Sequence, residues 1–78
     1  MSNDPLTFEE HRELGQEMQK TRQRLLQLSQ MLVQVYGANN RSAFAFEQLN
    51  TAVDRLLEEL GRQAAADCPD KEADTLYR

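Results

Sequence analysis

The sequence has no tryptophan, only one cysteine, two prolines and three glycines among its 78 residues. The single cysteine, Cys68, provides neither a disulfide framework nor a set of zinc ligands. No apolar run is long enough to cross a bilayer. The acidic N-terminus, MSNDPLTFEE, lacks the apolar segment of a signal peptide. We therefore expect a protein of the cytoplasm with no membrane contact, rich in helix because helix-breaking residues are scarce.

The charge balance is acidic, with nine Lys and Arg against thirteen Asp and Glu and a net charge of −4. General binding to nucleic acid requires many cations against the phosphates, so this composition disfavours it. The sequence also contains no catalytic, nucleotide-binding or metal-binding motif. We predict a non-enzymatic protein with no catalytic residue, no cofactor and no metal site.

A first helix is expected over residues 7–36, after a flexible lead of residues 1–6. Thr7 and Glu10 have the spacing of a capping box, while Asp4 followed by Pro5 offers a competing start. A heptad pattern then runs along one side of the helix, at His11, Leu14, Met18, Thr21, Leu25, Leu28, Leu32 and Val35. Gly37 is suited to a left-handed C-cap, so the helix should end at Tyr36.

A second helix is expected over residues 42–67, after a turn at residues 37–41. Asn39, Asn40 or Ser42 can cap its first turn. Its apolar positions again have helical spacing, at Phe46, Leu49, Val53, Leu56, Leu57, Leu60 and Ala64. Pro69 disfavours helix at the preceding residue, so residues 68–78 are expected to form a frayed polar tail. Asp70 could cap one further turn there.

The short turn makes the two helices antiparallel neighbours, so the fold class is all-α, a helical hairpin over residues 7–67. Reflection about the turn places Leu25 level with Val53, and Met18 level with Leu60. The same reflection places His11 level with Asp67 and Cys68, where we expect a half-buried structural histidine. Gly15 and Gly61 fall inside the helices at similar levels, which suggests either close helix approach or a kink.

The half of the hairpin near the turn has more apolar residues than one seam between two helices uses. Eight of the twelve residues from Leu25 to Tyr36 are apolar, and Arg41 is the only charged residue between Arg24 and Glu47. A surface of this kind usually marks an interface. The predicted interface consists of Leu25, Leu26, Leu28, Met31, Leu32, Val33, Val35, Tyr36, Phe44 and Phe46.

A second copy is the expected partner, giving a homodimeric four-helix bundle, although another protein could use the same surface. A monomeric hairpin, or a three-helix bundle that uses the tail, is the alternative architecture. The expected function is a small interaction, scaffold or regulatory module. The alternative function is RNA binding through Lys20, Arg22, Arg24 and a stripe of glutamines, Gln16, Gln19, Gln23, Gln27, Gln30 and Gln34.

Overall fold

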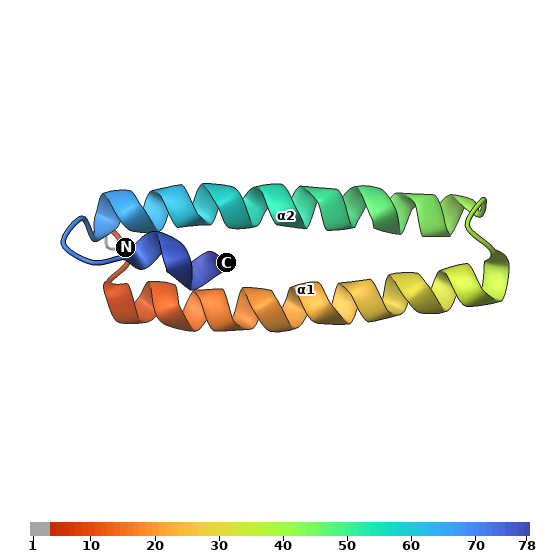
Figure 1. Cartoon of the computed structure of the whole chain (residues 1–78), viewed down its shortest axis with the longest axis horizontal. Coiled ribbons are helices and arrows are strands. Elements are labelled where there is room, and N and C mark those ends of the chain that lie inside the picture. The colour runs from red at the N-terminus through yellow and green to blue at the C-terminus, as the bar shows by residue number, and fades with distance from the viewer. Residues whose placement is uncertain (1–3) are drawn as a thin grey trace.

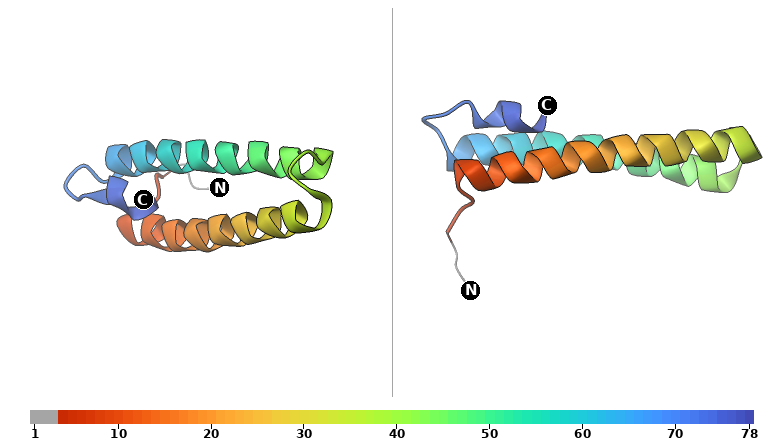
Figure 2. Two further views of the ribbon diagram at one scale, coloured as in Figure 1. Left: turned by 45° about the vertical axis from the view of Figure 1, so that its right-hand side comes forward. Right: turned by 90° about the horizontal axis from the view of Figure 1, so that it is seen from below.

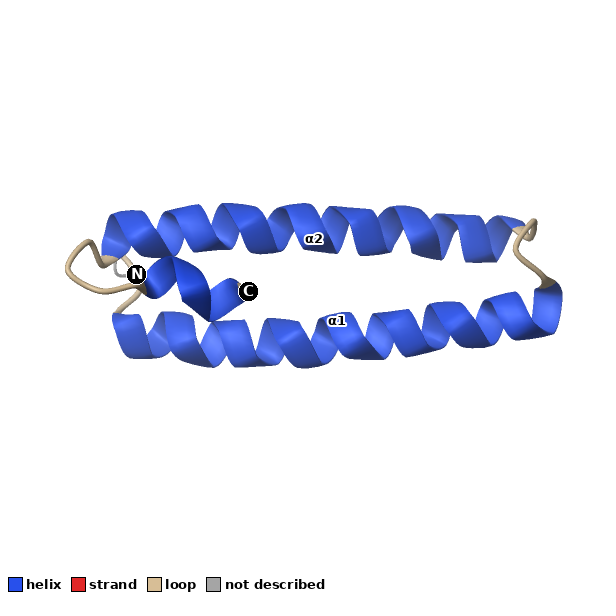
Figure 3. Ribbon diagram, in the orientation of Figure 1, coloured by secondary structure: helices blue, strands red, loops and turns tan. Residues whose placement is uncertain are grey.

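Two long helices lie side by side and antiparallel in the computed structural model, which describes residues 4–78 (Figure 1). Helix α1 spans Phe8–Tyr36, helix α2 spans Arg41–Asp67, and a short 3-10 helix, η1, spans Ala73–Tyr77. The described residues contain no strand (Figure 3). The predicted all-α hairpin is therefore confirmed. Of the expected flexible lead, residues 4–6 are non-helical and residues 1–3 lie outside the described part.

The capping box at the start of α1 is confirmed. The Thr7 side chain accepts a hydrogen bond from the Glu10 backbone N–H at 3.2 Å, and the Glu10 carboxylate accepts one from the Thr7 N–H at 2.9 Å. At the other end, the Gly37 N–H donates to the Val33 carbonyl at 2.8 Å. Gly37 has φ +87°, a backbone conformation that favours glycine, so the chain leaves α1 at the predicted residue.

Asn40 is the residue that caps α2 among the three candidates. Its side chain accepts hydrogen bonds from the backbone N–H groups of Ser42 and Ala43 at 2.8 and 3.4 Å. Such a cap satisfies donors that the first turn of a helix leaves unpaired. The helix ends at Asp67, and the Cys68 N–H donates to the Ala64 carbonyl at 2.9 Å.

The segment 68–78 is ordered and packs against both long helices, which corrects the expectation of a frayed tail. Its 3-10 helix, η1, lies on one side of the hairpin near the chain termini, while residues 4–7 leave on the opposite side (Figure 2). Ala73 is fully buried and Tyr77 is 3% exposed. The sequence pattern did not predict this element, because its few apolar residues stand among charged and polar ones and the segment as a whole is polar.

Gly15 allows η1 to approach α1 closely, and Gly61 lies beside η1 on α2. A Cβ atom built on Gly15 would collide with the backbone carbonyl of Leu76. A Cβ atom on Gly61 would lie 3.4 Å from the backbone oxygen of Asp74, which is a tolerable contact. Gly15 therefore accommodates the third element, and both glycines lie against η1 and not at a close crossing of α1 and α2.

The core is concentrated at the open end of the hairpin, where the two helices and η1 meet. Its buried residues are Val53, Leu57, Ala64, Ala73 and Tyr77, and the partly buried Leu14, Met18, Leu25 and Leu60 pack against them. A fully buried large apolar side chain contributes about 1.5–3 kcal/mol. The segment expected to be a frayed tail therefore closes the open end of the hairpin and contributes two residues to its core.

Candidate functional site

The predicted interface residues remain accessible in the half of the hairpin near the turn. Six of the ten are exposed, and Leu25, Leu28, Leu32 and Phe46 are half-buried. The exposed six are Leu26, Met31, Val33, Val35, Tyr36 and Phe44, which we call the turn-proximal surface. Val35 is 66% exposed although the heptad pattern placed it in the core stripe.

This surface exists because the third element stops short of the turn. Between residues 25 and 50 only Ala43 is buried. Figure 1 shows that η1 lies alongside the open half of the hairpin and leaves the other half as two helices alone. Two helices share a single seam, so large apolar side chains beside that seam have nothing to pack against.

Two leucines in the apolar series of α2 are exposed. Leu49 is 44% exposed and Leu56 is 46% exposed, whereas Val53 and Leu57 of the same apolar series are buried. The series is wider than one seam requires, which was the available signal. The structure shows which members face α1, and Leu49 and Leu56 do not.

The exposed apolar residues lie on two sides of the hairpin. At 3.6 residues per turn, positions that differ by two residues lie roughly 200° apart around a helix. On α2, Gly61 contacts η1 and Asp54 and Glu58 line the groove beside it, so Ala52 and Leu56 fall on the other side. We call this other side the back face; on α2 it carries Ala45, Leu49, Ala52 and Leu56, and on α1 it carries Leu28, Met31 and Val35.

The basic residues that could contact RNA are engaged with neighbouring side chains. The Arg22 guanidinium donates to the Asp54 carboxylate at 2.7 Å and so links α1 to α2. Nζ of Lys20 lies 3.7 Å from a carboxylate oxygen of Glu17, and the Arg24 guanidinium donates to the Gln27 side-chain oxygen at 3.4 Å. These exposed contacts contribute little stability individually. They do reduce the local positive charge that a phosphate backbone would meet.

A buried hydrogen-bonded chain of three side chains joins all three elements at the open end. Nε2 of His11 lies 2.8 Å from the Asp67 carboxylate, and Nδ1 lies 2.7 Å from the Tyr77 hydroxyl. A carboxylate only accepts, so in neutral His11 the Nε2–H donates to Asp67 and Nδ1 accepts from Tyr77. His11 is fully buried, which corrects the expectation of a half-buried side chain, while its proximity to Asp67 is confirmed.

The surroundings shift the proton affinity of two members of this chain. The hydrogen bond from His11, with a second from Gln63, lowers the pKa of Asp67 below its ordinary value. Burial, with a smaller effect of the Asp67 carboxylate, raises the pKa of Tyr77. Both ring nitrogens of His11 have hydrogen-bond partners within the protein. The arrangement is suited to holding η1 in place.

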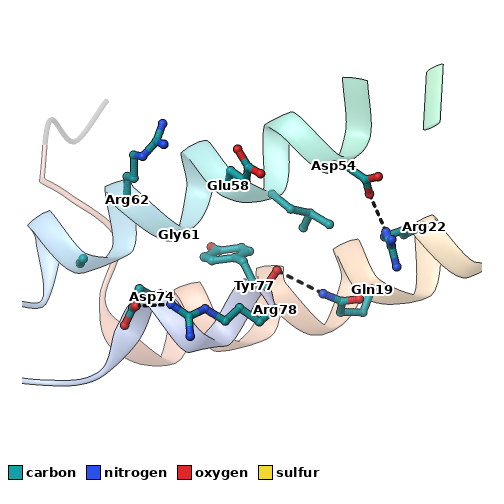
Figure 4. Close-up of a pocket in the computed structure, with 11 residues that line it drawn as sticks. Gln19, Arg22, Asp54, Glu58, Gly61, Arg62, Asp74, Tyr77 and Arg78 are labelled. Atoms are coloured by element: carbon teal, nitrogen blue, oxygen red, sulfur yellow. Dashed lines mark hydrogen bonds and ion pairs between the residues drawn. The ribbon is translucent and has the colours of Figure 1, made fainter. Parts of the chain in front are cut away.

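A shallow groove runs along the edge of η1, and most of the charged groups around it are paired (Figure 4). Arg22 pairs with Asp54 at one end, and Arg78 pairs with Asp74 at 3.0 Å on η1 itself. The Gln19 amide donates to the Tyr77 backbone carbonyl at 3.3 Å, and so ties η1 to α1. Of these contacts, the hydrogen bond from Gln19 fastens the third element to the hairpin.

Within residues 4–78, no three His, Cys, Asp or Glu residues are grouped so that they could hold a metal ion. No helix in this part of the chain is both long and apolar enough to span a bilayer. No protein-family model, curated protein or solved structure matches this chain. The exposed apolar residues of the hairpin are therefore the feature on which a function can be argued.

Proposed function

We propose that this protein is a non-enzymatic interaction module that self-associates through the apolar residues left exposed near its turn, forming a homodimeric four-helix bundle. The observation that carries the proposal is the contrast between the two halves of the hairpin. The open half has its own core of residues from three elements, whereas the turn-proximal surface has six exposed apolar side chains.

The energetic argument favours burial of this surface. Each large apolar side chain transferred from water contributes about 1.5–3 kcal/mol, and an exposed patch of this kind usually marks an interface. The patch is also nearly uncharged, since Arg41 is the only charged residue between Arg24 and Glu47. A second copy presents an identical apolar surface, and the closed symmetry of a dimer buries both at once.

Sedimentation equilibrium of Val35→Glu beside Gln34→Glu tests this proposal. Both variants place the same charge on the same exposed turn of α1, but only Val35 belongs to the turn-proximal surface. We expect the wild type and Gln34→Glu to be dimers at micromolar concentrations and Val35→Glu to dissociate. A wild type that stays a folded monomer throughout this range contradicts the proposal.

RNA binding is the second candidate, and the ion pair between Arg22 and Asp54 argues against it. We expect no retardation of RNA in a mobility-shift assay, even at low salt, where phosphate contacts are strongest. A shift that weakens with added salt and is lost in Arg24→Gln would favour RNA binding instead.

A further inference from the structure

Resting on the self-association proposed above, we infer that two copies pair antiparallel through their back faces, with α2 against α2 and with Met31 and Val35 of the turn-proximal surface included in the contact. Ala45, Leu49, Ala52 and Leu56 of each copy form the central seam of this dimer. The two-fold axis passes between the two copies of α2, at the level midway between Asn50 and Thr51.

The four residues form an exposed stripe with coiled-coil spacing. They are separated by four, three and four positions, which aligns them along one side of a helix. Leu49 and Leu56 are 44% and 46% exposed, and Ala45 and Ala52 are exposed as well. This stripe is distinct from the seam that α2 already makes with α1 through Val53 and Leu57.

The order of large and small side chains makes the stripe complementary to itself when one copy is reversed. With the axis between Asn50 and Thr51, Leu49 of one copy faces Ala52 of the other, and Leu56 faces Ala45. Every leucine then meets an alanine, which lets the side chains interdigitate and the helices approach closely. The contact is isologous, because each pair occurs twice.

The distribution of charge favours the reversed direction over a parallel one. All charged residues except Arg41 lie outside residues 25–46, where thirteen Asp and Glu outnumber eight Lys and Arg. A parallel dimer would place two acidic open ends against each other. The antiparallel dimer places each acidic end beside the turn of the other copy, where like charges are absent.

The position of η1 decides which side of the hairpin is available. It occupies one side of the open half, where its backbone passes directly over Gly15 and Gly61. The right-hand view of Figure 2 shows η1 above the pair of long helices. On the back face, by contrast, all four residues of the stripe on α2 are exposed.

The decisive experiment combines Leu56→Glu in one chain with Ala45→Lys in another. Each variant alone places two charges in the seam of its homodimer, and we expect its dissociation constant to rise by about 100-fold or more. In the mixed dimer, the carboxylate introduced at position 56 of one chain meets the ammonium introduced at position 45 of the other. The second pair, Leu56 with Ala45, is unchanged. We expect sedimentation equilibrium of the equimolar mixture to show a dimer, even where each variant alone associates weakly or folds poorly.

Thr51→Glu is the matched control, because Thr51 is exposed on α2 but lies outside the turn-proximal surface and about 100° around the helix from Ala52. We expect it to dimerise as the wild type does. Dimers of Leu56→Glu alone, or a mixture that stays monomeric, overturn the seam while leaving self-association standing. A wild-type monomer overturns both the seam and the proposed function.

Discussion

The hydroxyl of Tyr77 lies 2.7 Å from Nδ1 of His11, although 66 residues separate them in the chain. The two rings meet edge to face, with their centroids 5.8 Å apart. His11 is on the first turn of α1 and Tyr77 is at the end of η1, so this contact closes the open end of the hairpin. It also explains how a fully buried histidine is tolerated, since both of its ring nitrogens have partners.

Tyr77→Phe should destabilise the protein while leaving its fold intact. The substitution keeps the buried ring but leaves Nδ1 of His11 without a partner, which typically costs about 1–3 kcal/mol. Urea unfolding followed by circular dichroism measures the loss. Tyr36→Phe is the control, because Tyr36 is 63% exposed and should tolerate the change within about 0.5 kcal/mol. Equal stabilities of the two variants would contradict a structural role for the Tyr77 hydroxyl.

Gly15→Ala should loosen η1, although alanine is the better helix former. In an exposed helix this change stabilises by up to about 1 kcal/mol. Here the added Cβ collides with the Leu76 carbonyl, and overpacking of this kind costs about 1–3 kcal/mol. We expect a net loss of stability, with faster amide hydrogen exchange over residues 73–77.

Gly61→Ala is the matched comparison for that prediction. It makes the same chemical change at a similar level of the hairpin, but its Cβ would lie 3.4 Å from the Asp74 oxygen. We expect exchange over residues 73–77 to stay near that of the wild type. If both alanine variants were stabilised alike, η1 could not be packed against α1 as closely as the structure shows.

The stability of the protein should fall in acid because the pKa of Asp67 is lowered by its hydrogen bond from His11. A carboxyl whose pKa is lower in the folded state stabilises fully above its unfolded value, near 3.9, and loses this contribution as the pH falls through the folded pKa. Asp67→Asn should therefore reduce stability at neutral pH, and it should flatten the dependence of stability on pH between about pH 5 and pH 2. An unchanged slope in this variant would rule Asp67 out as the group responsible.

The stability of the protein should also fall in alkali, because of the ionisation of Tyr77. Burial raises its pKa in the folded state, so the neutral phenol stabilises fully below the ordinary value near 10. That contribution is lost as the pH rises through the folded pKa. Spectrophotometric titration at the phenolate absorbance should show an ionisation above the ordinary tyrosine pKa, and Tyr77→Phe should remove that step.

The two long helices could be predicted from the sequence because their signals are local. The capping box at Thr7 and Glu10, Gly37 after the last apolar residue, and Asn40 before the second helix each act within a few residues. The antiparallel pairing also follows from a short turn, and the predicted level of His11 with Asp67 is confirmed by their 2.8 Å contact.

The packing of the third element could not be predicted in the same way. The closure of the open end depends on Tyr77 reaching His11 and on Gly15, which leaves room for the backbone of Leu76. Neither relation has a fixed spacing in the sequence. Similarly, the series Leu49, Val53, Leu56 and Leu57 has helical spacing throughout, and only the position of α1 separates its buried members from its exposed ones.

Removal of residues 70–78 should show how much of the hairpin's stability depends on η1. The deletion exposes His11 and Ala64 and removes the buried Ala73 and Tyr77. We expect the free energy of unfolding to fall by more than about 3 kcal/mol, from lost apolar burial and the unpaired histidine together. For a chain of this size that is a large share of the total, so thermal unfolding should lose its cooperativity.

A chain that ends at Tyr77 is the control, because it lacks only the exposed Arg78 and should unfold nearly as the wild type does. Cooperative unfolding of the longer deletion at an unchanged midpoint would show that α1 and α2 hold the hairpin without η1.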